Sequence, residues 1–127
     1  MKALVIDDSR VMRKIIGRIL TPLGFQVLEA GDGQEGLDVL GDNTDVTLAC
    51  IDWNMPVMNG LDFVKAVRNE RDLSDVTLMM VTTESEQGQI VRALAAGAHE
   101  YVIKPFTAEA IEEKLQLLGL VSREEMA

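Results

Sequence analysis

Cysteine and histidine are almost absent from this sequence, which contains one of each in 127 residues. A lone cysteine, Cys50, excludes an internal disulfide and a zinc site built from cysteines. Because Cys50 lies within an apolar run, we expect it in the core. His99 has no serine or cysteine partner in a recognisable motif, so we expect a surface residue and not a catalytic one.

Basic residues are also scarce, with 12 Lys and Arg against 21 Asp and Glu and a net charge of −9. This balance argues against sequence-independent binding to nucleic acid, which requires basic surface, and against docking on anionic membranes. No apolar run approaches the ~20 residues that span a bilayer. The N-terminal apolar run is too short for a signal peptide and meets acidic residues at Asp7. We therefore expect a cytoplasmic protein.

Glycine and proline are scattered, so the sequence contains no linker and no low-complexity stretch. Its length is that of one domain, and 47% apolar residues are enough to form a core. We predict a single domain over residues 1–127 without an attached output domain. The acidic tail, residues 122–127, is expected to be a solvated end.

Five short apolar, β-branched runs alternate with segments of helical periodicity. Near-continuous apolar runs of this kind are typical of strands buried on both faces, as in parallel sheets. The predicted strands are 2–7, 25–30, 46–52, 76–82 and 99–103. The predicted helices are 11–20, 34–40, 61–67, 90–95 and 111–118.

Several residues predict where these helices begin and end. Thr83 and Glu86 have the spacing of a capping box ahead of the fourth helix, and Thr107 is expected to cap the fifth. Gly24 and Gly97 follow helices, where a left-handed residue is common.

The fivefold strand–helix alternation predicts an α/β fold, a doubly wound five-stranded parallel sheet with right-handed crossovers and helices on both faces. Spacing alone does not give the strand order. We adopt the flavodoxin-like order 2-1-3-4-5, partly on the resemblance described below.

Polar residues follow the predicted strands at their carboxyl ends. In open α/β sheets, ligands bind beyond these ends, near the point where the strand order reverses. The residues found there are Asp7, Asp8, Asp52, Thr82 and Lys104. In the adopted order the first and third strands are neighbours, so three carboxylates are expected to converge on one small volume.

Three carboxylates at close range repel one another, and a hard divalent cation resolves the conflict. Mg²⁺ prefers oxygen ligands and is usually held by one or two carboxylates plus phosphate oxygens. Such an ion would let an anionic phosphoryl donor approach a carboxylate. Lys104 and Thr82 would offer a positive charge and a hydroxyl donor to the phosphoryl oxygens. Aspartate is an established nucleophile that forms aspartyl-phosphate, so the residues indicate phosphoryl transfer.

Taken singly, these residues have simpler explanations. Asp8 and Ser9 could cap the first helix, and Asp52 could form a turn. Thr82 could end a strand, and Lys104 could be a solvated surface lysine. Complementary chemistry at four strand ends favours a functional site over these separate explanations.

A set of short motifs carries a family resemblance. Its members are Asp7, Asp8, Asp52 within IDWNMPVMNG, Thr82, Tyr101 and Lys104-Pro105-Phe106. Together they resemble the receiver domain of two-component response regulators, over nearly the whole chain. Trp53, Asn54 and Glu84, with the segment KPFTAEAIEEKL, bring the likeness nearest to the stand-alone regulators of chemotaxis.

The resemblance implies roles at the acidic end of the site. Asp52 accepts a phosphoryl group from a phosphohistidine of a sensor histidine kinase. The side chains of Asp8 and Asp52 bind Mg²⁺, and Asp7 does so largely through water. The backbone carbonyl of Asn54 completes the set of protein ligands.

The resemblance also implies a switch. Lys104 pairs with the phosphoryl group, Thr82 moves to hydrogen-bond it, and Tyr101 changes rotamer. The Lys104–Pro105 bond is expected to be cis, a geometry that costs only ~0.5–1 kcal/mol before proline. Thr83 departs from the common family pattern of a smaller residue and could narrow access to the phosphoryl group.

By the same resemblance, the chain is a monomer that catalyses only its own phosphorylation and dephosphorylation and is otherwise no enzyme. Its expected partners are a sensor kinase, a phosphatase and an output protein such as the flagellar motor switch. A phosphorelay shuttle or phosphate sink without a motor partner is the alternative.

Two other classes fit less well. A Mg²⁺-dependent phosphohydrolase usually carries Asp-x-Asp at its nucleophile, where this chain has Asp52-x-Asn54. A flavodoxin-like flavin binder needs a first loop rich in serine and threonine, and this chain lacks one.

Overall fold

The computed structural model of the chain describes residues 1–122, so the tail predicted for residues 122–127 lies outside the described residues from residue 123 onward. The strands are β1 (Lys2–Ile6), β2 (Gln26–Ala30), β3 (Val46–Ile51), β4 (Thr77–Thr82) and β5 (Glu100–Ile103). The α-helices are α1 (Arg10–Leu20), α2 (Gly33–Asp42), α3 (Gly60–Arg68), α4 (Gln87–Ala96) and α5 (Ala108–Leu117). Two short 3₁₀ turns, η1 (Thr21–Leu23) and η2 (Arg71–Leu73), follow α1 and α3.

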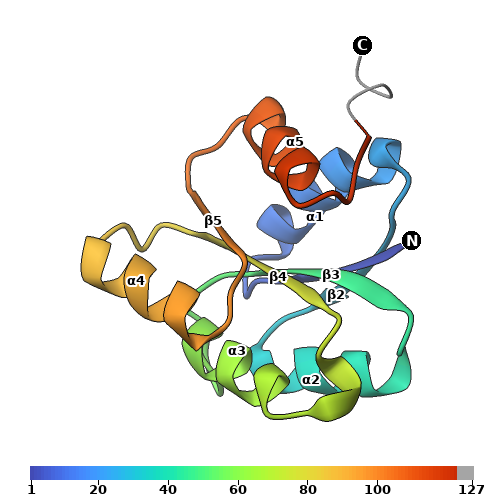
Figure 1. Ribbon diagram of the computed structural model, residues 1–127. Coiled ribbons are helices and arrows are strands. Elements are labelled where there is room, and N and C mark those ends of the chain that lie inside the picture. Colours follow the sequence, from blue (N-terminus) through green and yellow to red (C-terminus); the bar gives the residue numbers. More distant parts are fainter. Residues whose placement is uncertain (123–127) are drawn as a thin grey trace.

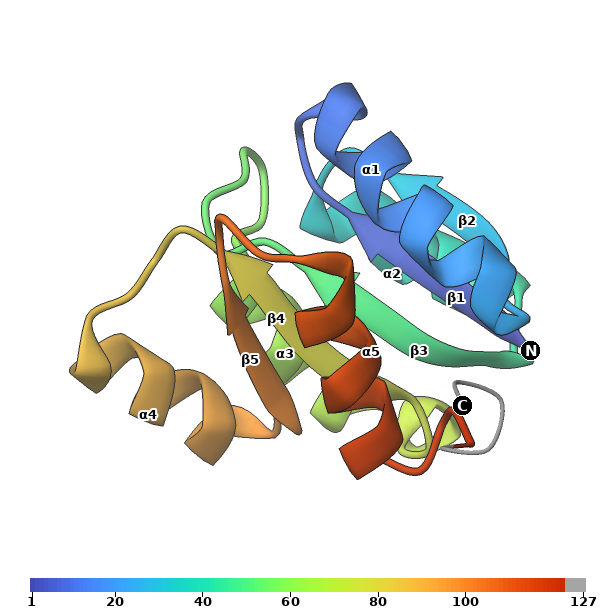
Figure 2. The same ribbon diagram turned by 90° about the horizontal axis from the view of Figure 1, so that it is seen from above.

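The sheet is parallel throughout and has the order β2-β1-β3-β4-β5, which confirms the predicted fold. Figure 1 shows α1 and α5 on one face of the sheet and α2 and α3 on the other. Helix α4 lies towards the β5 edge, as the view from above in Figure 2 also shows. None of the helices in residues 1–122 combines the length and apolar character that a membrane span requires.

Two apolar cores lie on opposite faces of the sheet, and the strands supply alternate residues to each. Met80 in β4 joins Phe63 and Leu4 in one core. Its neighbour Met79 joins Ile16 in the other. These side chains are fully buried, and each contributes about 1.5–3 kcal/mol by leaving water. The strands are therefore buried on both faces of the sheet, as the near-continuous apolar runs of the sequence predicted.

Cys50 is buried in the second core, as predicted. Burial raises the pKa of its thiol to about 12, so the thiolate needed for reactivity is not formed near neutral pH.

Helix ends agree with the prediction in one case and differ in another. The Thr107 hydroxyl accepts a hydrogen bond from the Ala110 backbone N–H and caps α5, as expected. The prediction of a capping box at Thr83 and Glu86 is wrong. Helix α4 begins at Gln87, its N-cap is Glu86, and no side chain caps it. The chain uses residues 83–86 to turn away from β4, which places Thr83 outside the helix.

The second helix is longer than predicted, although Gly36 lies within it. A Cβ at this position would press against side-chain atoms of Ile6 and Phe63. Gly36 therefore allows close packing on the sheet and does not interrupt the helix.

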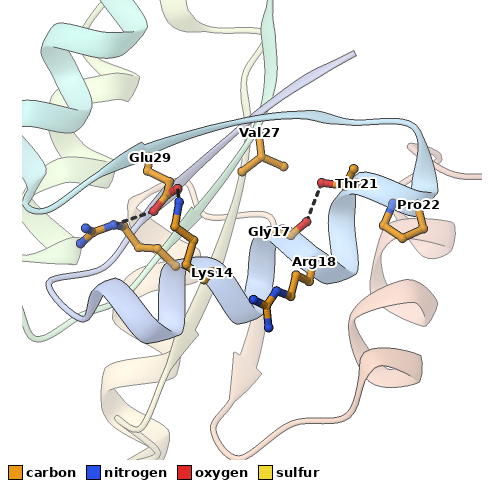
Figure 3. Close-up of a pocket in the computed structure, with 8 residues that line it drawn as sticks. Lys14, Gly17, Arg18, Thr21, Pro22, Val27 and Glu29 are labelled. Atoms are coloured by element: carbon orange, nitrogen blue, oxygen red, sulfur yellow. Dashed lines mark hydrogen bonds and ion pairs between the residues drawn. The ribbon is translucent and has the colours of Figure 1, made fainter.

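A cavity of about 450 Å³ opens between α1 and the edge strand β2 (Figure 3). Lys14, Gly17, Val27 and Glu29 are among the residues that line it. It lies beside an ion pair between Lys14 and Glu29, whose Nζ and Oε2 are 2.6 Å apart.

Arg68, at the end of α3, holds together the segments at the end of the sheet where β4 begins. Its guanidinium donates to the backbone carbonyls of Gly97, Ser74 and Val76. Gly97 and Gly24 have positive φ, as predicted, and a Cβ at Gly97 would collide with the Arg68 side chain. The start of β4 and the end of α4 are thereby joined through one side chain.

His99 belongs to the same junction and is exposed, as predicted. Its Nδ1 accepts from the Leu78 backbone N–H at 3.1 Å and lies 3.2 Å from Arg68 Nη2. A proton on Nδ1 would therefore point at two other hydrogen-bond donors, the Leu78 N–H and the Arg68 guanidinium, and would be disfavoured. The residue as a whole is exposed, but partial burial of its ring, with the Arg68 charge in second place, lowers the pKa of His99 below its usual value of 6.5.

We predict that acid weakens the fold through this histidine. The unfolded chain binds a proton near pH 6.5, whereas the folded chain does so only at lower pH. The contribution of His99 is therefore complete above about pH 6.5 and is lost as the pH falls below it. Urea unfolding at about pH 7.5 and 5.5 should show a smaller drop in free energy for His99→Gln than for the native chain. Equal drops would contradict the prediction.

Candidate functional site

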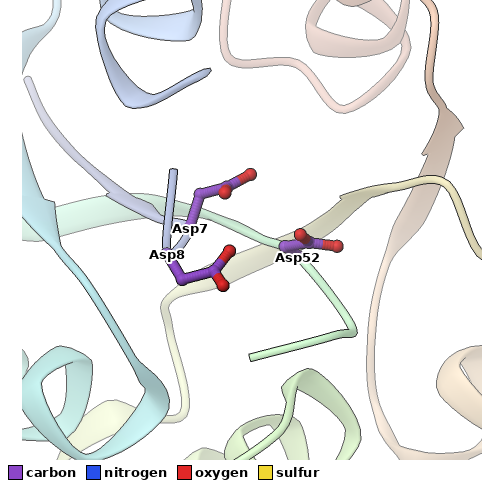
Figure 4. A group of neighbouring side chains, drawn as sticks. All are labelled: Asp7, Asp8 and Asp52. Atoms are coloured by element: carbon purple, nitrogen blue, oxygen red, sulfur yellow. The ribbon is translucent and has the colours of Figure 1, made fainter. Parts of the chain in front are cut away.

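The carboxyl ends of β1 and β3 bring acidic residues together. Asp7 and Asp52, predicted as the last residues of the first and third strands, lie one residue beyond the ends of β1 and β3 but stay hydrogen-bonded to the sheet. The Asp7 N–H donates to the Ala30 carbonyl, and the Asp52 N–H to the Ile6 carbonyl. Carboxylate oxygens of Asp7, Asp8 and Asp52 lie within 4.8 Å of one another, which confirms the predicted convergence (Figure 4).

Burial separates the three carboxylates into two kinds. Asp7 is 1% and Asp52 8% exposed, whereas Asp8 lies open to solvent. Burying a charged group without a partner is costly. The site must therefore supply compensation for Asp7 and Asp52 from within the protein.

Lys104 supplies that compensation. Its Nζ lies 2.7 Å from Asp7 Oδ2 and 3.4 Å from Asp52 Oδ2, and its side chain is only 11% exposed. The Lys104 backbone N–H donates to the Thr82 carbonyl, which fixes the residue beside the end of β4. The Lys104–Pro105 peptide is cis, as predicted. Lys104 is thus not a solvated surface lysine.

The turn from β1 into α1 holds Asp7 by a second contact. Asp7 Oδ1 accepts from the Ser9 backbone N–H at 2.9 Å. The Ser9 hydroxyl in turn accepts from the Met12 N–H and caps α1. Since Ser9 fulfils the capping role, the Asp8 carboxylate is left for another use.

Asp52 has one oxygen without a partner. Oδ1 is buried and accepts no hydrogen bond from the residues that the structure describes. Such an acceptor costs about 1–3 kcal/mol unless something else satisfies it. Three carboxylates and one ammonium also leave two negative charges uncompensated. A hard divalent cation prefers oxygen ligands, and its two positive charges would balance this excess of two negative charges. The acidic pocket could therefore hold a metal.

Thr82 and Tyr101 lie behind this pocket. Thr82 is fully buried, and its hydroxyl oxygen accepts from the Glu84 backbone N–H at 3.3 Å. Tyr101 is 8% exposed, and its hydroxyl donates to the Glu84 carbonyl at 2.6 Å. Burial raises the pKa of Tyr101 to about 12, with smaller effects of the Glu84 and Asp52 charges. The Tyr101 side chain is therefore held inward by its bond to the Glu84 carbonyl, and its predicted change of rotamer stays a prediction.

Asn54 is exposed, two residues beyond Asp52, and its predicted role as a carbonyl ligand stays a prediction. Thr83 is exposed as well.

The loop after β3 contains a feature that sequence reasoning missed. The Met58 N–H donates to the Pro56 carbonyl across Val57, which has φ of 69° and is 82% exposed. This is a γ-turn of the rare, strained kind. A β-branched residue gives no signal for positive φ, so nothing in the sequence marked the turn.

Sequence reasoning also missed Arg13. Its Nη1 donates to the Asp7 backbone carbonyl at 2.7 Å. The helical periodicity of α1 places Arg13 on the polar side and carries no information about this contact.

Comparisons with known proteins agree with this geometry. The model of the response regulator receiver domain family matches residues 3–116. The chain is 49% identical over 126 residues to a chemotaxis protein CheY homolog of Campylobacter jejuni, covering 98% of this chain and 97% of that protein. It is 44% identical over 119 residues to chemotaxis protein CheY1 of Helicobacter pylori, covering 93% and 96%.

Among solved structures, the chemotaxis response regulator CheY4 of Vibrio cholerae is similar, with a TM-score of 0.84 and 34% identity. The match covers 92% of this chain and 97% of that one.

We predict that Lys104 is needed for stability because it lies between two buried carboxylates. Lys104→Met should lower the free energy of unfolding by about 3 kcal/mol, since removing one partner leaves buried charge uncompensated. Lys14→Met is the matched control, because it breaks an ion pair of an exposed lysine. Its cost should stay below about 1 kcal/mol. Equal losses in chemical denaturation would show that Lys104 does not compensate the carboxylates.

Proposed function

The chain belongs to the response regulator receiver domain family, and on that premise we propose that it is a signalling module switched by phosphorylation of Asp52. The observation that carries the proposal is the environment of Asp52. Its buried carboxylate has one oxygen paired with Lys104 and one without a hydrogen bond from the described residues, next to two further carboxylates.

The residues at this edge fit a phosphoryl transfer that depends on position and charge. In the proposed step, an Asp52 oxygen forms a bond to phosphorus as the bond to the histidine nitrogen of the donor breaks. The Lys104 ammonium, already 3.4 Å from Asp52, stays close enough to stabilise the added oxygens. Asp8 and Asp52 would hold Mg²⁺, which supplies charge neutralisation when bound. Asp7 supports the site through its pairing with Lys104.

The read-out is proposed to run through Thr82 and Tyr101. Phosphorylation adds up to roughly two negative charges and three acceptor oxygens at Asp52. Thr82 is the buried hydroxyl that would turn towards them, giving up its bond from the Glu84 N–H. Because Tyr101 bonds the Glu84 carbonyl, the same loop residue links both side chains. Phosphorylation would then shift the population between two packings of the 83–86 loop.

The output is proposed to be a separate protein. The similar proteins with 44–49% identity are chemotaxis regulators, so we propose a flagellar motor switch as the output partner and a sensor histidine kinase as the phosphoryl donor. A phosphatase would end the signal. The chain is proposed to act as a single domain and a monomer, with no catalysis beyond its own phosphorylation and dephosphorylation.

Acetyl phosphate tests the proposed acceptor. With Mg²⁺ present, we expect one phosphoryl group per chain, located at Asp52 by mass spectrometry and labile to hydroxylamine. Asp52→Asn should abolish labelling, whereas Asp75→Asn, at an exposed aspartate away from the carboxylate cluster, should not. Chelation of Mg²⁺ should also abolish it. Undiminished labelling of Asp52→Asn would place the acceptor elsewhere.

Thr82→Ala tests the read-out. We expect this variant to be phosphorylated like the native chain but to lose most of the gain in affinity for a motor-switch peptide, measured by calorimetry. Coupling of this kind commonly amounts to ~1–3 kcal/mol, or about 5–150-fold in affinity. Thr83→Ala removes the neighbouring, exposed hydroxyl and should keep the gain. A full gain in Thr82→Ala would leave Thr82 as an ordinary strand residue.

A further inference from the structure

We propose that Arg13 is a positioning residue for the metal site, because it holds the peptide between Asp7 and Asp8 in the orientation that aims Asp8 at Asp52. This inference rests on the proposed function. Arg13 touches neither Asp52 nor the phosphoryl donor in this scheme, and it acts through the backbone of the β1–α1 turn.

The guanidinium of Arg13 connects three elements. Nη1 donates to the Asp7 carbonyl at 2.7 Å, and Nε donates to Glu29 Oε1 at 3.0 Å. Arg13 lies on α1, Asp7 ends β1, and Glu29 lies on β2. A side chain on the helix therefore ties the turn that carries both aspartates to the neighbouring strand.

The contacts of Asp7 show why this one matters for Asp8. The Asp7 N–H and both of its carboxylate oxygens have other partners: the Ala30 carbonyl, the Ser9 N–H and Lys104. Arg13 is the donor that the described residues provide for the Asp7 carbonyl. That carbonyl belongs to the peptide leading into Asp8, so its orientation sets the direction in which the exposed Asp8 side chain leaves the turn.

Glu29 fixes the orientation of Arg13. Its second oxygen accepts from Lys14 Nζ at 2.6 Å, so the carboxylate is held by two cations. Lys14 most strongly, and Arg13 less so, keep the pKa of Glu29 below its usual value of 4.5, against the effect of burial. Figure 3 shows Lys14 and Glu29 facing each other at the side of the cavity between α1 and β2. Arg13 also lines this cavity with a side chain that is 18% exposed, and its two hydrogen bonds fix the direction of the guanidinium.

Positioning and charge predict opposite effects on metal binding. Removing a positive charge near an acidic site should strengthen cation binding if Arg13 acts only through its charge. Removing the support of a ligand-bearing turn should weaken it, typically by 10–100-fold. Lys14 offers a matched control, because it carries the same charge, follows Arg13 in α1 and shares Glu29, yet the bond to the Asp7 carbonyl comes from Arg13.

The experiment is a Mg²⁺ titration followed by the emission of Trp53, the only tryptophan in the chain and the neighbour of Asp52. We expect Arg13→Met to bind Mg²⁺ about tenfold more weakly than the native chain, or worse. Lys14→Met should bind with equal or higher affinity. Arg13→Lys keeps the charge but cannot reach both partners, so it should also be weakened. Glu29→Gln should lie between the native chain and Arg13→Met.

The inference would be overturned if Arg13→Met and Arg13→Lys bound Mg²⁺ as tightly as Lys14→Met, or more tightly. Thermal unfolding without Mg²⁺ checks that each variant is folded. If Arg13→Met does not fold, the comparison of Arg13→Lys with Lys14→Met decides. A native chain that binds no Mg²⁺, by emission and by calorimetry, would instead count against the metal site of the proposed function.

Discussion

Mutual repulsion among three carboxylates is the constraint on which the rest of this structure depends. Oxygens of Asp7, Asp8 and Asp52 lie within 4.8 Å of one another, and two of these side chains are buried. Left alone, such a cluster would push the β1–α1 turn away from the end of β3. The fold resists this because strand pairing extends to Asp7 and Asp52, and because Lys104 reaches both from the far side of β4. The remaining negative charge is what makes the site receptive to a divalent cation.

Most of the architecture could be predicted from the sequence because its causes are local and repetitive. Strands buried on both faces require continuous apolar runs, and these runs located the strands to within a residue or two. The carboxylate cluster followed once the order of strands was adopted, since parallel strands deliver their carboxyl ends to one edge. That order came partly from a family resemblance and not from spacing, and the sheet confirms it.

The features that were missed depend on contacts between distant segments. The spacing of Thr83 and Glu86 fits a capping box, but the bond between Tyr101 and the Glu84 carbonyl holds the 83–86 loop out of the helix. The γ-turn at Val57 is imposed by the loop that follows Asp52, against the preference of a β-branched residue. Arg13 on α1 contacts the Asp7 carbonyl and also Glu29, which comes from the separate strand β2. Periodicity and propensity contain none of this information.

Helix α4 would connect the proposed chemistry at Asp52 to the surface of the molecule, because polar contacts hold the chain at both of its ends. Ala93 is its one fully buried residue, while Val91 and Leu94 are 57% and 42% exposed. Arg68 anchors its C-terminal end through the Gly97 carbonyl, at the edge of the sheet opposite to the carboxylates. Its N-terminal end follows the loop that Tyr101 and Thr82 hold at Glu84. A rearrangement of that loop would therefore move one end of α4 while Arg68 keeps the other in place, and a small body of buried contacts would offer little resistance. In the proposed switch, a change in the 83–86 loop would therefore reach the surface as a tilt of α4 about the end that Arg68 holds.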